Sequence, residues 1–223
     1  MPFLELEALS YAWPGQVPCL DMGAFALEAG EQVFLHGPSG SGKSTLLNLL
    51  AGVLKPDSGD IRLLGHSLPS LSGAARDRLR ADHIGLIFQQ FNLIPYLSVL
   101  DNVHLPCRFS TRRRQRAGHP VEAAHRLLRH LDLDAALWNR PAHALSVGQQ
   151  QRVAAARALI GTPELVIADE PTSALDAERQ AAFLDLLARE CASAGAALVF
   201  VSHDRRLAAG FSREVALAEL NRA

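Results

Sequence analysis

The chain has 223 residues, 48% of them hydrophobic, which is enough to bury the core of one large domain or two small ones. Its 22 Lys and Arg residues almost balance its 23 Asp and Glu residues, and a net charge of −1 disfavours a dedicated nucleic-acid-binding protein. No apolar run reaches the roughly 20 residues of a membrane-spanning helix. Three widely spaced cysteines predict neither a disulfide framework nor a zinc site, and the first ten residues lack a secretory pattern. We expect a cytosolic protein, soluble or docked to a partner.

The first third of the chain predicts two kinds of sheet. Strand-like pieces before residue 36 are separated by Trp13-Pro14-Gly15 and Glu28-Ala29-Gly30, which is typical of antiparallel hairpins. Short apolar runs then alternate with longer helical patterns, as in βαβ units with a mainly parallel sheet. These runs are Gln32–His36, Ile61–Leu64, Ile84–Phe88, Leu165–Ala168 and Ala197–Val201. The last two are apolar throughout, so we expect them at the centre of the sheet.

Strand signals disappear between about residues 89 and 144, where a helical insertion is the simplest interpretation. One apolar stripe at helical spacing supports it, formed by Val121, Ala124, Leu127, Leu128 and Leu131. A further helix is expected to begin at Ser146, whose hydroxyl suits an N-cap, and to end near Gly161. The basic run Arg112–Arg116 is interpreted as a solvated loop, with a lipid or partner contact as the alternative.

The segment after the strand at residues 32–36 predicts a phosphate-binding loop. It fits the spacing GxxxxGK[ST] and precedes a helical run at Thr45–Leu54. Glycines there let backbone N–H groups face phosphate oxygens, and the helix N-terminus adds partial positive charge. We expect Lys43 to bridge the β- and γ-phosphates and Ser44 to bind Mg²⁺. The predicted nucleotide-binding residues are Gly37, Pro38, Ser39, Gly40, Ser41, Gly42, Lys43, Ser44 and Thr45.

Polar residues follow three predicted strands at one edge of the sheet. Asp169 and Glu170 end the run at 165–168, and the carboxyl ends of parallel strands are where ligands bind. We expect Asp169 to hold Mg²⁺, directly or through water, and Glu170 to activate the attacking water. His203 follows Ala197–Val201 and is expected to reach the γ-phosphate, and Gln89 follows the run at 84–88. Together with the phosphate loop, these residues favour nucleotide hydrolysis over binding alone.

The segment Leu145-Ser146-Val147-Gly148-Gln149 resembles the LSGGQ signature of ATP-binding cassette (ABC) ATPases, and the chain resembles that family over essentially its whole length. The resemblance implies an α/β, P-loop NTPase (RecA-like) core with a mainly parallel sheet, an N-terminal antiparallel β-subdomain and an inserted α-helical subdomain. It further implies a single ABC ATPase domain over 1–223. Residues 1–88 and 160–223 would form the catalytic core with the β-subdomain, and 89–159 the helical subdomain with the signature.

The resemblance also implies how the site works. Two copies would pair head to tail around two ATP molecules with Mg²⁺, the signature residues Ser146, Gly148 and Gln149 of one copy capping the γ-phosphate bound by the other. Val147 replaces the usual glycine. We expect this to cost a modest loss of ATP affinity in the closed dimer but to leave the site active. The resemblance also implies catalysis by Glu170, His203 and Gln89, and metal binding by Ser44, Gln89 and Asp169. It implies a D-loop that lies at the dimer interface, at Ser173-Ala174-Leu175-Asp176. Adenine would stack on Trp13, with Tyr11 as the alternative.

Within the family, the segments Phe88–Pro95 and Val99–Val103 resemble the lipoprotein-release, macrolide-export and FtsE-type ATPases. This implies integral membrane permease subunits whose coupling helix enters a groove after Gln89, and a peripheral location on the cytoplasmic face of the inner membrane. No nucleic acid and no direct cargo contact are expected. The alternatives are FtsE-like regulation of cell-envelope processes without transport, a soluble ABC protein of ribosomes or DNA, and a P-loop kinase, against which the signature and D-loop argue.

Overall fold

The computed structural model describes residues 2–173 and 175–223, and within them it contains two sheets. The antiparallel sheet has the strand order β2-β1-β4-β5, and the parallel sheet has the order β6-β7-β8-β3-β9. The strands are β1 Leu4–Ala12, β2 Pro18–Leu27, β3 Gln32–His36, β4 Ser58–Leu63, β5 His66–Ser67, β6 Ile84–Ile87, β7 Leu165–Asp169, β8 Ala197–Val201 and β9 Arg213–Ala216.

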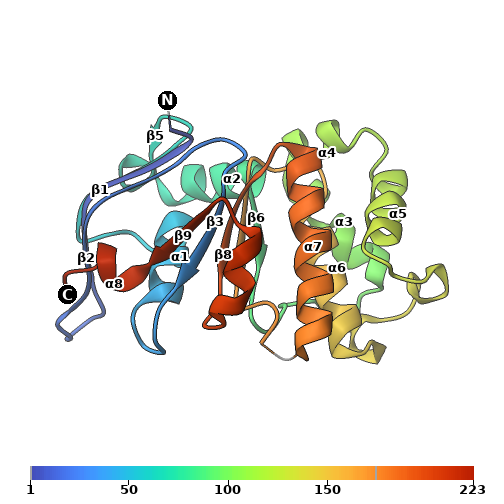
Figure 1. Cartoon of the computed structure of the whole chain (residues 1–223). Coiled ribbons are helices and arrows are strands. Elements are labelled where there is room, and N and C mark those ends of the chain that lie inside the picture. Colours follow the sequence, from blue (N-terminus) through green and yellow to red (C-terminus); the bar gives the residue numbers. More distant parts are fainter. Residues whose placement is uncertain (1, 174) are drawn as a thin grey trace.

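Helices cover the parallel sheet and extend to one side of it (Figure 1). They are α1 Lys43–Leu50, α2 Gly73–His83, α3 Val99–Phe109, α4 Thr111–Ala117, α5 Pro120–His130, α6 Val147–Leu159, α7 Ala177–Ala194 and α8 Leu217–Leu220. Short 3₁₀ turns are η1 Leu68–Ser70, η2 Ala135–Leu137, η3 Ala142–Ala144 and η4 Arg205–Gly210. Among residues 2–173 and 175–223, no helix is both long enough and apolar enough to cross a membrane. The fold is that of a P-loop NTPase.

The antiparallel hairpin predicted for the first residues is confirmed, but one predicted parallel strand belongs to the same sheet. Strands β1 and β2 pair antiparallel, and Ile61 of β4 lies opposite Leu6 of β1. Ile61 and Leu63 are buried, whereas Arg62 between them is exposed. This alternation marks a strand with one solvated face, which antiparallel sheets accommodate and doubly covered parallel sheets do not.

The central strands of the parallel sheet are those that the sequence predicts. Every residue of β8 and all but the last of β7 are buried, and both strands have neighbours on each side. Strand β9, which pairs with β3 at the sheet edge, is not among the strands that the sequence predicts. Its first two residues are exposed and charged, so the strand carries no apolar run. Pairing with β3, and not local pattern, makes it a strand.

The helical insertion is confirmed, with two corrections. In α5 the residue Val121 is exposed and Ala123 is buried instead, because helical spacing alone does not show where along a helix the packing begins. The basic run is a helix, α4, and not a loop, although its arginines other than Arg113 are exposed as expected. Arg113 in it is 2% exposed and donates from Nε to the carbonyl of Ile160 at 2.8 Å and from Nη2 to that of Ala158. Arg113 therefore holds α4 against the end of α6.

Candidate functional site

The phosphate loop runs from β3 into α1 with backbone conformations that favour glycine. Gly40 and Gly42 have φ values of 78° and 94°, in the left-handed region. A Cβ on Gly42 would lie 3.0 Å from a methyl carbon of Leu20, so space and conformation both require glycine there. Lys43, 7% exposed, donates from Nζ to the carbonyls of Gly37 at 2.9 Å and Pro38 at 2.8 Å. The ammonium group thus lies within the concave side of the loop.

Glu170, the residue after β7, reaches the same place. Glu170 Oε1 lies 3.9 Å from Lys43 Nζ, and Glu170 Oε2 lies 3.4 Å from His203 Nδ1. Glu170 has a φ of 43°, an uncommon conformation for a residue other than glycine. Its N–H donates to the carbonyl of Val201 at 3.0 Å, which fixes this backbone against β8. Three predicted residues from distant parts of the sequence are therefore in contact.

Oxygen donors suited to a magnesium ion lie beside Lys43. Burial and the adjacent charge of Glu170 raise the pKa of Asp169, against a hydrogen bond from Ser44 and the charge of Lys43. A hydroxyl, a carboxylate and the amide oxygen of Gln89 are hard donors of the kind that Mg²⁺ prefers. In the loop itself, the buried Oγ of Ser41 has no hydrogen-bond partner among the described residues, as expected of a site that completes its bonds with a ligand. The residues fit a magnesium-bound nucleotide.

A cavity of about 440 Å³ joins these groups to the β1–β2 hairpin. It is lined by Trp13, Gln16, Cys19, Ser39, Gly40, Gly42, Lys43, Ser44, Thr45, Gln89 and Glu170. Most of these residues are ones that the sequence predicts. Gln16 and Cys19 were missed, because they belong to no motif and reach the cavity only through the hairpin fold, in which Gln16 N–H donates to the Trp13 carbonyl. Their nearness to Trp13 in the sequence was the only available signal.

The structure separates the two aromatic residues proposed for adenine stacking. Trp13 lines the cavity and is 40% exposed, whereas Tyr11 is 7% exposed within the core of the antiparallel sheet. Their ring centroids lie 5.4 Å apart in an edge-to-face arrangement. Tyr11 therefore supports Trp13 from behind, and Trp13 is the ring available to a base.

The signature residues lie at a different cavity of the same chain, about 490 Å³ in volume, which Ser146, Val147, Gly148 and Gln149 help to line. Ser146 caps α6 in a capping box: its Oγ accepts from Gln149 N–H at 3.3 Å, and Gln149 Oε1 accepts from Ser146 N–H at 2.9 Å. The predicted helix start is therefore confirmed. None of these signature residues lines the nucleotide cavity of its own chain.

The segment predicted as a D-loop borders the signature cavity. Leu175 lines that cavity, and the Asp176 carboxylate caps α7 by accepting from Arg179 N–H at 3.0 Å. Asp176 also lies 3.2 Å from Arg179 Nη1. Ala174, which belongs to this prediction, lies outside the described residues. Asp176 thus has a local structural role in addition to the interfacial role predicted for it.

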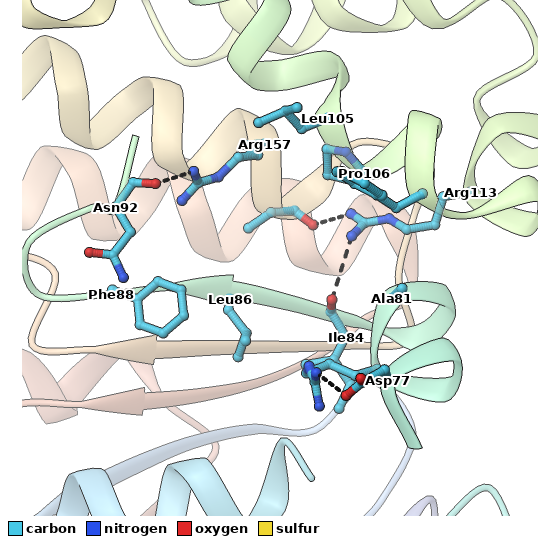
Figure 2. Close-up of a pocket in the computed structure, with 13 residues that line it drawn as sticks. Asp77, Ala81, Ile84, Leu86, Phe88, Asn92, Leu105, Pro106, Arg113 and Arg157 are labelled. Carbon is cyan, nitrogen blue, oxygen red and sulfur yellow. Dashed lines mark hydrogen bonds and ion pairs between the residues drawn. The ribbon is translucent and has the colours of Figure 1, made fainter. Parts of the chain in front are cut away.

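A groove of about 330 Å³ lies between β6, α2, α3, α4 and α6, and Phe88, the residue before Gln89, lines it (Figure 2). Apolar side chains dominate it, including Leu86, Phe88, Leu105 and Phe109, and Phe109 is 79% exposed. Arg157 borders the groove and donates to the carbonyls of Phe91 and Asn92, which follow Gln89 in the sequence. The floor of the groove is thereby connected to the nucleotide cavity through a short segment of chain.

The fold and the cavity together define a P-loop nucleotide hydrolase. A family model described as ABC transporter matches residues 20–173. The lipoprotein-releasing system ATP-binding protein LolD of Syntrophotalea carbinolica is 40% identical over 193 residues, covering 86% of this chain and 83% of LolD. The macrolide export ATP-binding/permease protein MacB of Rhodopirellula baltica is 40% identical over 203 residues, covering 91% of this chain but 29% of MacB. The chain belongs to the ATP-binding cassette family of transporter ATPases.

Among solved structures, the dimeric cassette MJ0796 of Methanocaldococcus jannaschii in a post-hydrolysis state with ADP and phosphate has a TM-score of 0.86. It is 34% identical, and the match covers 98% of this chain and 94% of that one. The protein is an ABC-type ATP hydrolase that acts as an ATP-binding subunit of a transporter.

Proposed function

We propose that two copies of this chain pair head to tail around two magnesium-bound ATP molecules and, as they close and reopen, move integral membrane permease subunits. The observation that carries the proposal is the convergence of Lys43, Glu170 and His203 on one cavity, while the signature faces a separate one. Because Ser146 does not line the nucleotide cavity of its own chain, a second copy would have to supply it. The dimeric form of MJ0796 supports this arrangement.

Each site residue has a physical task in this proposal. Trp13 stacks on adenine, and Lys43 with the loop N–H groups of residues 37–45 binds the phosphates. Ser44, Asp169 and Gln89 would hold Mg²⁺, which neutralises charge on the phosphates when bound. Glu170 accepts a proton from the water that attacks the γ-phosphorus, as the bond to the β-phosphate oxygen breaks. His203 orients the γ-phosphate. Ser146, Gly148 and Gln149 cap it from the partner copy, and Asp176 crosses the dimer interface.

The ATP-driven movement follows from contacts that exist in only one state. ATP phosphates would contact both copies and favour the closed dimer, and loss of the γ-phosphate removes the contacts across the interface. The groove beside Gln89 would receive a coupling helix of the permease, because it is apolar, exposed and connected to the nucleotide cavity. The chain would then lie at the cytoplasmic face of the inner membrane. MacB, in which a cassette and a permease share one chain, supports such a partner.

A substitution of the catalytic carboxylate tests the catalytic part of the proposal. Glu170→Gln keeps the shape of the side chain but not its basicity, so we expect ATP turnover to fall at least about 100-fold with ATP binding retained. Steady-state phosphate release and equilibrium ATP binding are the measurements. Glu122→Gln, an exposed carboxylate on α5, is the matched control and should hydrolyse ATP at the wild-type rate. Unchanged hydrolysis in Glu170→Gln would refute the assigned role.

The same variant tests the dimer. With ATP, Glu170→Gln should elute from gel filtration as a dimer, since bound ATP is not consumed. Adding Ser146→Arg should return it to a monomer by placing a bulky cation where a phosphate cap is needed. A persistent monomer in the single variant would count against the head-to-tail arrangement.

The membrane partner is tested by tagging the chain in its native cell, solubilising membranes gently and identifying the proteins that co-purify. A polytopic protein with a large extracytoplasmic domain supports the lipoprotein-release and macrolide-export subgroup. Recovery of cell-wall regulators without a transported cargo would favour FtsE-like regulation. Ribosomes or repair factors alone would overturn the transporter proposal and leave the ATP hydrolase assignment in place.

A further inference from the structure

The loop that carries His203 rests on strand β3. Ser202 N–H donates to the carbonyl of Leu35 at 3.3 Å, and β3 leads directly into the phosphate loop. Ser202 is 4% exposed, and its Oγ accepts from Asp204 N–H at 3.1 Å. The backbone on both sides of His203 is therefore held by a residue that is itself anchored to the strand supporting the phosphate loop.

A carboxylate on the edge strand β9 links the same two segments a second time. Glu214 Oε1 accepts a hydrogen bond from Arg205 Nε at 2.8 Å, and Arg205 Nη2 lies 2.8 Å from the same oxygen. His36 Nε2, from the last residue of β3, lies 3.0 Å from that oxygen. In the parallel pairing Glu214 is opposite Phe34, which is two residues before His36, so register places Glu214 and His36 on one face of the sheet.

This arrangement is separate from the nucleotide cavity. His36, Arg205 and Glu214 are absent from the cavity lining, so their contacts with one another are not contacts with ATP. His36 is mostly buried, whereas the Arg205 side chain is 69% exposed. One mostly buried group and one exposed group thus share a single carboxylate oxygen. Without that oxygen, the loop that carries His203 would lose the side-chain link from Arg205 through Glu214 to His36.

We propose that Glu214 is a positioning residue for ATP hydrolysis: its carboxylate holds the Arg205 side of the loop against the His36 end of β3 and so sets the position of His203 relative to the phosphate loop. This inference rests on the proposed function, because it requires that His203 act on the γ-phosphate. A displacement of about 1 Å in a group near the reaction can lower a rate by about 100-fold. A loop that is loosened rather than displaced should lower the rate of hydrolysis by less.

Glu214→Gln and Arg205→Gln test the link. Each should lower kcat roughly 3- to 30-fold while leaving KM for ATP within about twofold, since Trp13, Lys43 and the loop N–H groups are untouched. Arg205→Lys should recover about half of the lost rate, because both guanidinium contacts go to one oxygen that a point charge also satisfies. Arg206→Gln is the matched control: it lies in the same turn but pairs with Asp204, and should keep the wild-type kcat.

The outcomes separate this inference from the proposed function on which it rests. If wild-type hydrolysis depends on Glu170 but Glu214→Gln and Arg205→Gln keep the wild-type kcat, the inference alone is overturned. It is also overturned if the two variants raise KM as much as they lower kcat, or if Arg206→Gln loses as much rate. Both variants should unfold at the same temperature as the parent protein. Combined with Glu170→Gln, each should still dimerise when ATP is added. Should Glu214→Gln fail to fold, the exposed Arg205 variants carry the test by themselves.

Discussion

Lys43 shows how a single side chain depends on its fold. The Lys43 residue is buried, and its ammonium group has two backbone carbonyl partners and lies beside the acidic Glu170. The spacing of the motif predicts this lysine, and the fold adds that its position is fixed before any phosphate arrives. Preorganisation of this kind reduces the entropy lost on binding.

Removal of this charge should weaken ATP binding itself. Lys43→Gln is expected to raise the dissociation constant for ATP by roughly 10- to 100-fold, the value of a charge-assisted hydrogen bond to phosphate. Lys55, the second lysine of the chain, is exposed, so Lys55→Gln is the matched control. Equal affinities in equilibrium binding with a fluorescent ATP analogue would show that Lys43 does not hold the phosphates.

At the scale of elements, helix α4 is the clearest departure from the sequence-based interpretation. Arg112 and Arg116 donate to Glu164 Oε1, and His83 Nδ1 lies 2.9 Å from Glu164 Oε2. Although burial would raise it, these hydrogen bonds and charges lower the pKa of Glu164 to about 2. The cluster connects α2, α4 and the turn before β7. Within the basic run, Arg112, Arg113 and Arg116 therefore make structural contacts, although Arg112 and Arg116 are also exposed.

This cluster predicts a pH dependence of stability. The pKa of Glu164 is about 2 in the folded chain against an ordinary 4.5, so its contribution is complete above about pH 4.5 and is lost as pH falls to about 2. Because Arg112 and Arg116 are partly exposed, we expect about 2 kcal/mol at pH 7. Denaturant unfolding of wild type and Glu164→Gln at several pH values measures it. Two curves with a constant separation from pH 7 to pH 3 would contradict the assignment, and exposed Glu122→Gln is the control.

At the scale of the whole molecule, the groove near Gln89 is the surface that would transmit the proposed movement to the membrane partner. It is lined by residues of strand β6 and of helices α2, α3, α4 and α6 (Figure 2). The division into a core of 1–88 and 160–223 and a helical subdomain of 89–159 stays a prediction. The contacts of Arg113 with Ile160 and Ala158 join α4 to the end of α6, close to the predicted boundary.

A charge placed in this groove should prevent partner binding. Phe109→Arg puts a cation on an exposed apolar wall, so the membrane partner should no longer co-purify from gently solubilised membranes. Val121→Arg, an exposed apolar position on α5 outside the groove, is the control and should recover the partner as wild type does. Matching unfolding midpoints for both variants exclude a folding defect. Recovery of the partner with Phe109→Arg would exclude the groove as the docking site.

The sequence by itself determined the features that depend on near neighbours in the chain. The spacing of Gly37 to Thr45 places a lysine and hydroxyls at the start of a helix, and the Ser146–Gln149 spacing allows a capping box, because both structures close within a few residues. The apolar runs of β7 and β8 likewise indicate full burial without knowledge of their neighbours.

The tertiary structure decided what depends on contacts between distant residues. Four features result from pairing or packing with elements far away in the sequence. They are the sheet that β4 joins, the burial of Arg113, the exposure of Trp13 rather than Tyr11 to the cavity, and the formation of strand β9. The link from Arg205 through Glu214 to His36 belongs to the same group. Such contacts leave no local periodicity, because their energy comes from partners whose identity the local pattern does not contain.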